Sequence, residues 1–228
     1  MHLNIELRFK CLLILLLRKQ CNISALGKNK LYLLIISAVL LATFCCSSPI
    51  KSNNVTLENQ TTALIEIPAG TTQKWELNKN NGLIERDTID GQPRTINYLG
   101  YPGNYGMIPN TILDKKNGGD GDPLDILVLG DPVKRGDLVN CKIIGVLKLI
   151  DNNENDDKLI GISTSSSLFK INSITEMDQS YPGISNIIET WFTNYKGKNT
   201  TKSLGFADKQ AAIDLLNAAT KQHNNLNN

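Results

Sequence analysis

The sequence predicts a mainly β domain with flanking helices, an α+β fold. Residues 62–162 contain short segments rich in Val, Ile and Leu that are separated by Gly, Pro, Asn and Asp, the pattern of strands joined by turns. Beyond residue 163, apolar residues recur with the helical period of about 3.6. With 228 residues, 41% of them hydrophobic, the chain can bury one core, and we expect one folded domain at residues 61–222.

The first 48 residues predict a targeting segment and not a part of this domain. Two lysines precede an apolar run at residues 31–44 that is short for a membrane span. The run ends at Cys45 and Cys46, and polar residues 49–60 follow as a tether. This arrangement resembles a bacterial lipoprotein signal, in which the cysteine is lipidated after cleavage. The large residue before the first cysteine leaves ordinary cleavage or a retained anchor as alternatives. We expect an exported protein, membrane-anchored or periplasmic, that touches the membrane only through the leader or a lipid.

The charge and the rare residue types of the domain exclude several classes of function. Residues 1–45 hold six of the 24 basic residues and one of the 22 acidic ones, which leaves 18 basic and 21 acidic residues, a net charge of −3. This balance does not favour a nucleic-acid partner. Beyond the leader, Cys141 is the only cysteine, and His2 and His223 lie near the chain ends. Disulfides, cysteine-rich zinc sites and histidine catalysis are therefore excluded, and carboxylates, Lys, Arg and Tyr remain.

The first strands are predicted at residues 62–68, 74–77 and 83–87, with turn signals between the second and third and again before residue 94. Glu66 stands among apolar neighbours in the first strand, where a solvent-facing strand glutamate is an equally good interpretation. In the second strand, charged and apolar residues alternate, so Lys74 lies on a charged face opposite a packed one.

Residues 97–106 contain three tyrosines among glycines and a proline. Nothing in this segment is periodic, and it predicts a loop held by packed aromatic rings. Tyrosine hydroxyls placed in such a loop can donate to phosphate oxygens. For Tyr98 we expect plain packing instead.

Residues 120–125, Asp-Gly-Asp-Pro-Leu-Asp, place three carboxylates directly before an apolar strand at residues 126–129. Carboxylates this close repel one another unless cations lie between them, and oxygen ligands suit Mg²⁺ or Mn²⁺. The motif therefore predicts a metal site, and an acidic surface turn is the alternative. An EF-hand loop fits poorly because Asp stands where that loop needs Gly and Glu.

The longest strand is predicted at residues 138–150. A second acidic patch follows at residues 151–158, before a short strand at residues 159–162. A solvated hairpin loop would also explain this patch. Two acidic patches that each adjoin a strong strand nevertheless favour a shared site.

Two helices are predicted near the C-terminus. The first carries an apolar stripe that begins at Ile184, includes Ile187 and ends at Tyr195, so that Tyr195 points inward beside Lys196. A core tyrosine is the usual interpretation of such a position. The second helix covers residues 208–221.

Taken together, these segments resemble the soluble (family I) inorganic pyrophosphatases over residues 60–215. The motifs that carry the resemblance, in chain order, are Ile65-Glu66-Ile67-Pro68-Ala69, Tyr101-Pro102-x-Asn104-Tyr105-Gly106, Asp120-Gly121-Asp122-Pro123-Leu124-Asp125, Gly145-Val146-Leu147-Lys148 and Asn194-Tyr195-Lys196. The resemblance implies a five-stranded OB-like barrel with flanking helices. Members of the family are usually cytoplasmic, so the cytoplasm is the alternative location. We also expect a homo-oligomer.

The resemblance also implies roles for twelve side chains. The tightly bound Mg²⁺, or Mn²⁺, would be held by Asp120, Asp125 and Asp156. The ions that arrive with the substrate would be bound by Asp151 and Glu66. The catalytic base would be Asp122. The phosphate ligands would be Lys74, Arg94, Tyr105, Lys158, Tyr195 and Lys196. Arg86 is a rival to Arg94, and Glu76 and Tyr101 would lie in supporting places.

The expected function is Mg²⁺-dependent hydrolysis of inorganic pyrophosphate to two orthophosphates by direct attack of a hydroxide that two metal ions share. Pyrophosphate carries about three to four negative charges near neutral pH, so cations must neutralise its oxygens before hydroxide can approach. Two Mg²⁺ ions that share a water lower its pKa from roughly 15.7 towards neutrality. The alternative is a non-catalytic divalent-metal or polyphosphate binding module of the cell envelope. A third reading, an OB-type nucleic-acid binder, is disfavoured by the net charge.

Overall fold

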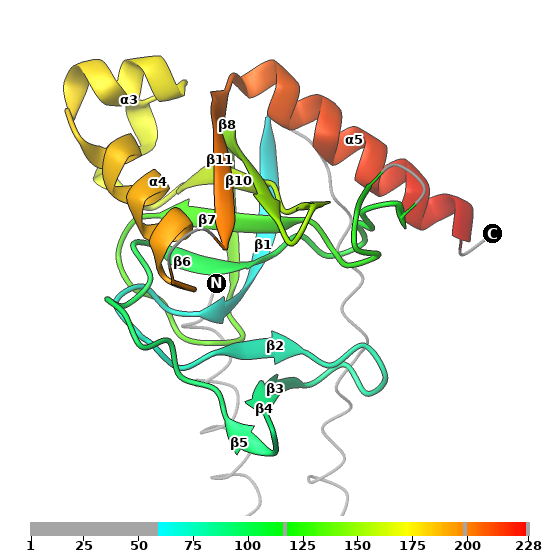
Figure 1. Cartoon of the computed structure of the whole chain (residues 1–228). Coiled ribbons are helices and arrows are strands. Elements are labelled where there is room, and N and C mark those ends of the chain that lie inside the picture. The colour runs from blue at the N-terminus through cyan, green and yellow to red at the C-terminus, as the bar shows by residue number, and fades with distance from the viewer. Residues whose placement is uncertain (1–58, 116–117, 198–199, 227–228) are drawn as a thin grey trace, which may run out of the picture. The chain divides into compact units, whose positions relative to one another are not determined.

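The computed structural model describes residues 59–115, 118–197 and 200–226. The predicted leader, residues 1–48, and nearly all of the predicted tether lie outside the described residues. Figure 1 shows strands gathered into one body, with helices packed against it and two small hairpins beside it. No helix within these three ranges has the length and apolar character needed to cross a bilayer.

Five strands pair edge to edge in a closed ring, which is the predicted five-stranded OB-like barrel. In order around the ring they are β1 (Gln60–Ile67), β6 (Asn104–Met107), β7 (Asp125–Leu129), β10 (Lys158–Ser163) and β8 (Leu138–Asp151), which returns to β1. Neighbours are antiparallel except β7 and β10, which run parallel. The 14 residues of β8 also leave room to pair with β9 (Glu154–Asn155) and β11 (Thr201–Ala207).

Both faces of the barrel wall are buried. Along β7, Ile126 and Val128 belong to one apolar cluster, whereas Leu127 and Leu129 belong to the other. The first cluster includes residues of α5 (Lys209–Leu226), and the second includes residues of α3 (Ile174–Ser180) and α4 (Ile184–Asn194). Because neither face of β7 or β10 meets water, residues 126–129 and 159–162 carry no polar side chains, whereas exposed and buried residues alternate at the start of β8.

The two predicted helices are present as α4 and α5. In α4, Ile188, Trp191 and Phe192 are buried as the periodicity predicts. Ile187 was placed in the same stripe, but its side chain is 62% exposed, so that part of the prediction is wrong. Sequence spacing assigns a wider apolar face to α4 than the face that the barrel covers. The short helix α3 and a 3₁₀ turn, η3 (Ser167–Lys170), precede α4.

Two hairpins lie outside the barrel sheet. Strand β2 (Trp75–Leu77) pairs with β3 (Ile84–Arg86), as the turn signal between them predicts. A smaller hairpin follows, in which β4 (Thr88–Ile89) pairs with β5 (Gln92–Pro93). Figure 1 shows both hairpins on the same side of the barrel.

The tyrosine-rich segment is only partly a loop. Its last residues, Asn104 to Gly106, open strand β6, which corrects the prediction of a loop over residues 97–106. Gly106 lies so close to β1 that a Cβ atom there would stand 1.9 Å from the carbonyl oxygen of Leu64. Glycine is therefore required by a close strand contact, whereas from sequence it indicates a turn. The predicted ring packing is present, since Tyr101 lies 5.0 Å from Tyr105 between ring centroids.

Candidate active site

A single cavity of about 300 Å³ gathers all twelve side chains to which the resemblance assigns a role. It lies at the meeting point of seven parts of the fold: β1, the β2–β3 hairpin, β6, the start of β7, the end of β8, the start of β10 and the end of α4. Glu76 also lines this cavity. The other four lining residues, to which the resemblance assigns no role, are Leu77, Lys79, Met107 and Pro123.

Lys158 lines the cavity and is 2% exposed. Its ammonium donates to Asp125 Oδ2 and to Asp156 Oδ1, each at 2.5 Å. The Tyr105 hydroxyl also donates to Asp125 Oδ2, at 2.6 Å. Burial alone would lower the pKa of Lys158, but the two carboxylates outweigh it and hold the pKa above its ordinary value. Burial would likewise raise the pKa of Asp125, but Lys158 outweighs it and holds that pKa low.

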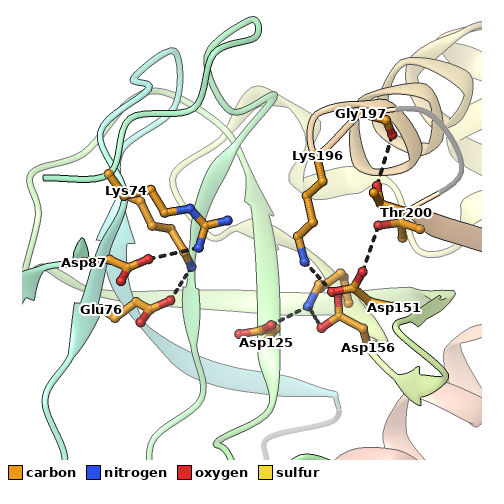
Figure 2. Close-up of polar contacts among 12 residues, drawn as sticks. Lys74, Glu76, Asp87, Asp125, Asp151, Asp156, Lys196, Gly197 and Thr200 are labelled. Carbon is orange, nitrogen blue, oxygen red and sulfur yellow. Dashed lines mark hydrogen bonds and ion pairs between the residues drawn. The ribbon is translucent and has the colours of Figure 1, made fainter. Parts of the chain in front are cut away.

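A second lysine pairs with the carboxylate at the end of β8. Lys196 Nζ donates to Asp151 Oδ2 at 2.5 Å, and Figure 2 shows these side chains directed toward one another beside Asp156. Burial would lower the pKa of Lys196, but Tyr195 and Asp151 raise it above its usual value. Lys196 therefore stays protonated and available to an anion.

The hairpin side of the cavity carries Lys74 and Arg94. Lys74 Nζ lies 2.7 Å from Glu76 Oε1, and Arg94 Nη1 lies 3.0 Å from Asp87 Oδ2. Figure 2 shows Lys74 and Glu76 facing each other, with Asp87 beside them. Arg86 does not line the cavity. Its guanidinium donates instead to the Arg94 carbonyl and to Thr95 Oγ1. The geometry thus favours Arg94 over its rival.

The acidic turn closes another side of the cavity. Asp120 Oδ1 accepts the backbone N–H of Asp122 at 2.8 Å, and Gly121 between them has a φ of +82°, which glycine adopts without strain. The side chain of Asp122 is 54% exposed and pairs with Lys79 from the β2–β3 hairpin. A lysine at a hairpin tip carries no sequence signal for this contact, because only the fold brings it to residue 122.

Glu66 enters the cavity from a bulge in β1. The pairing of β1 with β6 shifts between Ile65 and Ile67, which leaves Glu66 as the extra residue. The side chain is buried, and its Oε1 accepts the Leu77 N–H at 2.7 Å. Burial raises the pKa of Glu66 to about 7, although the Leu77 N–H acts in the opposite direction.

Aromatic stacking positions the tyrosines. The ring of Trp191 lies parallel to that of Tyr195 at 4.4 Å between centroids and packs against Tyr101 at 4.3 Å. Tyr101 is 2% exposed and does not line the cavity, so it supports its neighbours. Tyr98 is 40% exposed and contacts Trp191 edge-on, so it packs with a partly wet ring as expected.

The net negative charge of the cavity lining favours the binding of additional cations. Seven carboxylates and five cationic side chains line it, an excess of two negative charges. Among the described residues, Glu66 and Asp120 form no salt bridge, and burial raises the pKa of both. No three Asp, Glu, His or Cys side chains in this part of the chain are grouped closely enough to hold a metal ion as they stand. Lys158 takes the position between Asp125 and Asp156, the two carboxylates that do converge.

The family model for inorganic pyrophosphatases matches residues 63–224. The chain belongs to the inorganic pyrophosphatase family. It is 34% identical to the inorganic pyrophosphatase of Campylobacter jejuni over 171 residues, which cover 73% of this chain and 94% of the relative. It is also 34% identical to the mitochondrial inorganic pyrophosphatase 2 of Mus musculus, but that match covers 74% of this chain and only 58% of the mouse protein.

Structural comparison agrees with this family assignment. A truncated vacuolar soluble pyrophosphatase of Trypanosoma cruzi, solved in complex with PPi, superposes with a TM-score of 0.70 at 26% identity. The match covers 79% of this chain and 74% of the T. cruzi chain. The family resemblance that the sequence motifs indicate is thereby confirmed, together with the mainly β, OB-like fold.

Proposed function

We propose that this chain hydrolyses inorganic pyrophosphate to two orthophosphates in the presence of Mg²⁺, with Mn²⁺ as a substitute. The observation that carries the proposal is the single cavity in which carboxylates, lysines, an arginine and tyrosines from Glu66 to Lys196 meet. Such a set matches the needs of phosphoryl transfer, in which catalysis depends on positioning and on neutralising charge. The T. cruzi relative solved with PPi supports the choice of substrate.

The proposed metal ligands are Asp120, Asp125, Asp156, Asp151 and Glu66. Their hard oxygen donors and the excess negative charge of the cavity suit Mg²⁺ or Mn²⁺. When bound, these ions supply neutralising charge at the phosphate oxygens and make water more acidic.

The chain's own cations and hydroxyls are proposed to hold the substrate. Lys74 and Arg94 line the cavity from the hairpin region, and Lys158 and Lys196 line it from β10 and the end of α4, so cations from several elements neutralise an anion bound there. The tyrosine hydroxyls, on Tyr105 and Tyr195, add neutral donors. Asp122 lies half-exposed at the acidic turn, where it can accept the proton of the attacking water and pass it to solvent. No covalent phosphoenzyme is required.

The test is phosphate release from pyrophosphate by purified residues 49–228 with Mg²⁺ or Mn²⁺. We expect turnover in the wild type and a loss of about 10²- to 10⁴-fold in Asp122→Asn, the range for a general base. Asp131→Asn, which changes an exposed carboxylate outside the cavity, serves as the matched control. Absence of turnover in both metals would refute the proposal. Tight binding of pyrophosphate without turnover would instead identify a binding module.

We further propose that residues 1–48 direct export and that the domain assembles as a homo-oligomer. The leader proposal rests on the apolar run that ends at Cys45 and Cys46. Mass spectrometry of the mature N-terminus tests it, since an intact, unlipidated N-terminus in the cytoplasm would contradict it. Light scattering of the purified domain gives the subunit number, and a monomer at micromolar concentration would contradict the second proposal.

A further inference from the structure

The β2–β3 hairpin brings Lys74, Glu76 and Lys79 to the cavity, yet it is not part of the barrel sheet. Backbone hydrogen bonds hold the segments that flank it, since the Lys74 N–H donates to the Arg94 carbonyl and the Ile96 N–H donates to the Thr72 carbonyl. Contacts between the strands of the hairpin and the barrel involve side chains. One such contact is the hydrogen bond from the Leu77 N–H to Glu66 Oε1. A second contact is made by Trp75, whose side chain does not line the cavity, and we call it the outer contact.

This outer contact is made by Arg135, in the segment between β7 and β8. The guanidinium carbon of Arg135 lies 3.9 Å from the centroid of the Trp75 ring, a close cation–π distance. Its Nε also donates to the backbone carbonyl of Glu66 at 3.0 Å. One guanidinium thus contacts the hairpin and the bulge that carries a proposed metal ligand. We call Arg135, Trp75 and the Glu66 carbonyl the hairpin clamp.

The base of the clamp is rigid. The Gly136 N–H donates to the Ile65 carbonyl at 2.7 Å, and the Ile65 N–H donates to the Asp137 carbonyl at 3.0 Å. Arg135 is therefore anchored to β1 directly beside the bulge. Glu66 is the extra residue of that bulge, so its carbonyl is left available for a hydrogen bond from Arg135. The carboxylate of the same residue lines the cavity.

The alternation of side chains along β2 connects the contact between Arg135 and Trp75 with the cavity. Side chains that follow one another in a strand point to opposite faces. Trp75 does not line the cavity, whereas Glu76, the next residue of β2, and Lys74, which directly precedes β2, both do. Arg86, which pairs with Trp75 across the hairpin, lies 5.7 Å from the same ring and adds a weaker second contact.

We propose that Arg135 is a positioning residue that fixes Lys74 and Glu66 for binding of substrate and metal by clamping Trp75 and the Glu66 carbonyl. The proposal rests on the proposed function, because those two side chains are assigned there to phosphate and metal. Arg135 itself does not line the cavity. Lysine cannot replace it, because a planar guanidinium can stack on an aromatic ring and donate a hydrogen bond in its own plane at the same time, whereas an ammonium cannot.

The kinetic test uses Arg135→Ala, Arg135→Lys and the control Lys134→Ala, which removes the same charge from an exposed neighbour. For both Arg135 variants we expect the KM for pyrophosphate and the Mg²⁺ concentration at half-maximal rate to rise about tenfold, the ratio for losing one partly buried cation–π contact. The control should match the wild type. A purely structural role would lower the active fraction at unchanged KM, and that result, or full rescue by Arg135→Lys, would overturn the proposal.

A second measurement does not depend on catalysis or on metal. Hydrogen exchange of residues 75–86 in EDTA should be faster in Arg135→Ala than in Lys134→Ala, because the Leu77 amide loses a fixed acceptor. Trp75→Leu should change the exchange in the same direction, and the effect of the double variant should be smaller than the sum of the two single effects, since both variants remove the contact between Arg135 and Trp75. Unchanged exchange, or additive effects, would overturn the clamp. If the wild type lacked turnover, the proposed function would fail, and the exchange data would still decide the clamp.

Discussion

Replacing Glu66 by glutamine is expected to stabilise the metal-free protein at pH 8. Glu66 is buried with a pKa raised from 4.5 to about 7 by desolvation, so the folded state holds its proton where the unfolded state has lost it. Between these two pH values, stability falls as the pH rises. At about 1.4 kcal/mol per pKa unit, the raised pKa of Glu66 lowers the free energy of unfolding of the wild type above pH 7, by about 3 kcal/mol at most.

The Glu66→Gln variant removes this penalty without removing the hydrogen bond, because the glutamine side chain keeps an oxygen to accept the Leu77 N–H but carries no charge. Urea unfolding in EDTA at pH 5 and at pH 8 measures the difference between variant and wild type. We expect Glu66→Gln to gain little at pH 5 and up to about 3 kcal/mol at pH 8. Glu76→Gln, at an exposed carboxylate that pairs with Lys74, is the control and should gain nothing.

Mg²⁺ should reduce the stability advantage of the Glu66→Gln variant. A cation bound at Glu66 stabilises only the folded wild type, so the advantage of the variant at pH 8 should shrink or disappear as Mg²⁺ is added. The reasoning is refuted if the difference between the two proteins is the same at pH 5 and pH 8 in EDTA. It is also refuted if the variant is less stable than the wild type at pH 8 without metal.

Two further predictions concern the core. Cys141 is fully buried with a pKa raised to about 12 by desolvation, so iodoacetamide at pH 8 should modify it only after unfolding; rapid labelling of the native domain, followed by mass spectrometry, would contradict this. Trp191→Ala should destabilise the domain by about 3–5 kcal/mol, because the ring is 3% exposed, stacks on Tyr195 and packs at an angle against Tyr101. Trp191→Phe should lose distinctly less in thermal unfolding, and equal losses would show that the stacking contributes little.

The elements that could be predicted from the sequence are those specified by local pattern. The strand that begins at Asp125 and the helix that begins at Ile184 carry a strong apolar run and a clear helical period, so their positions follow from a few neighbouring residues. The acidic turn before Asp125 is likewise local, because its three carboxylates are adjacent in the chain. The remaining site residues were assigned through the family resemblance.

The elements that could not be predicted depend on contacts between distant residues. Strand β6 contains Gly106, which looks like a loop residue until β1 is known to lie against it. Strand β11 was not predicted at all, because its exposed and half-buried residues give no alternation and only pairing with β8 defines it. The contact of Lys79 with Asp122 is of the same kind. Local propensity has no information about any of these pairs.

The spread of the cavity along the chain has a consequence for biosynthesis. Its lining begins at Glu66 and ends at Lys196, so both ends of the domain must be in place before the cavity exists. A polypeptide emerging from the ribosome with its amino end first cannot assemble it until α4 has been made. A truncated translation product that stops before Tyr195 and Lys196 therefore cannot form the complete cavity.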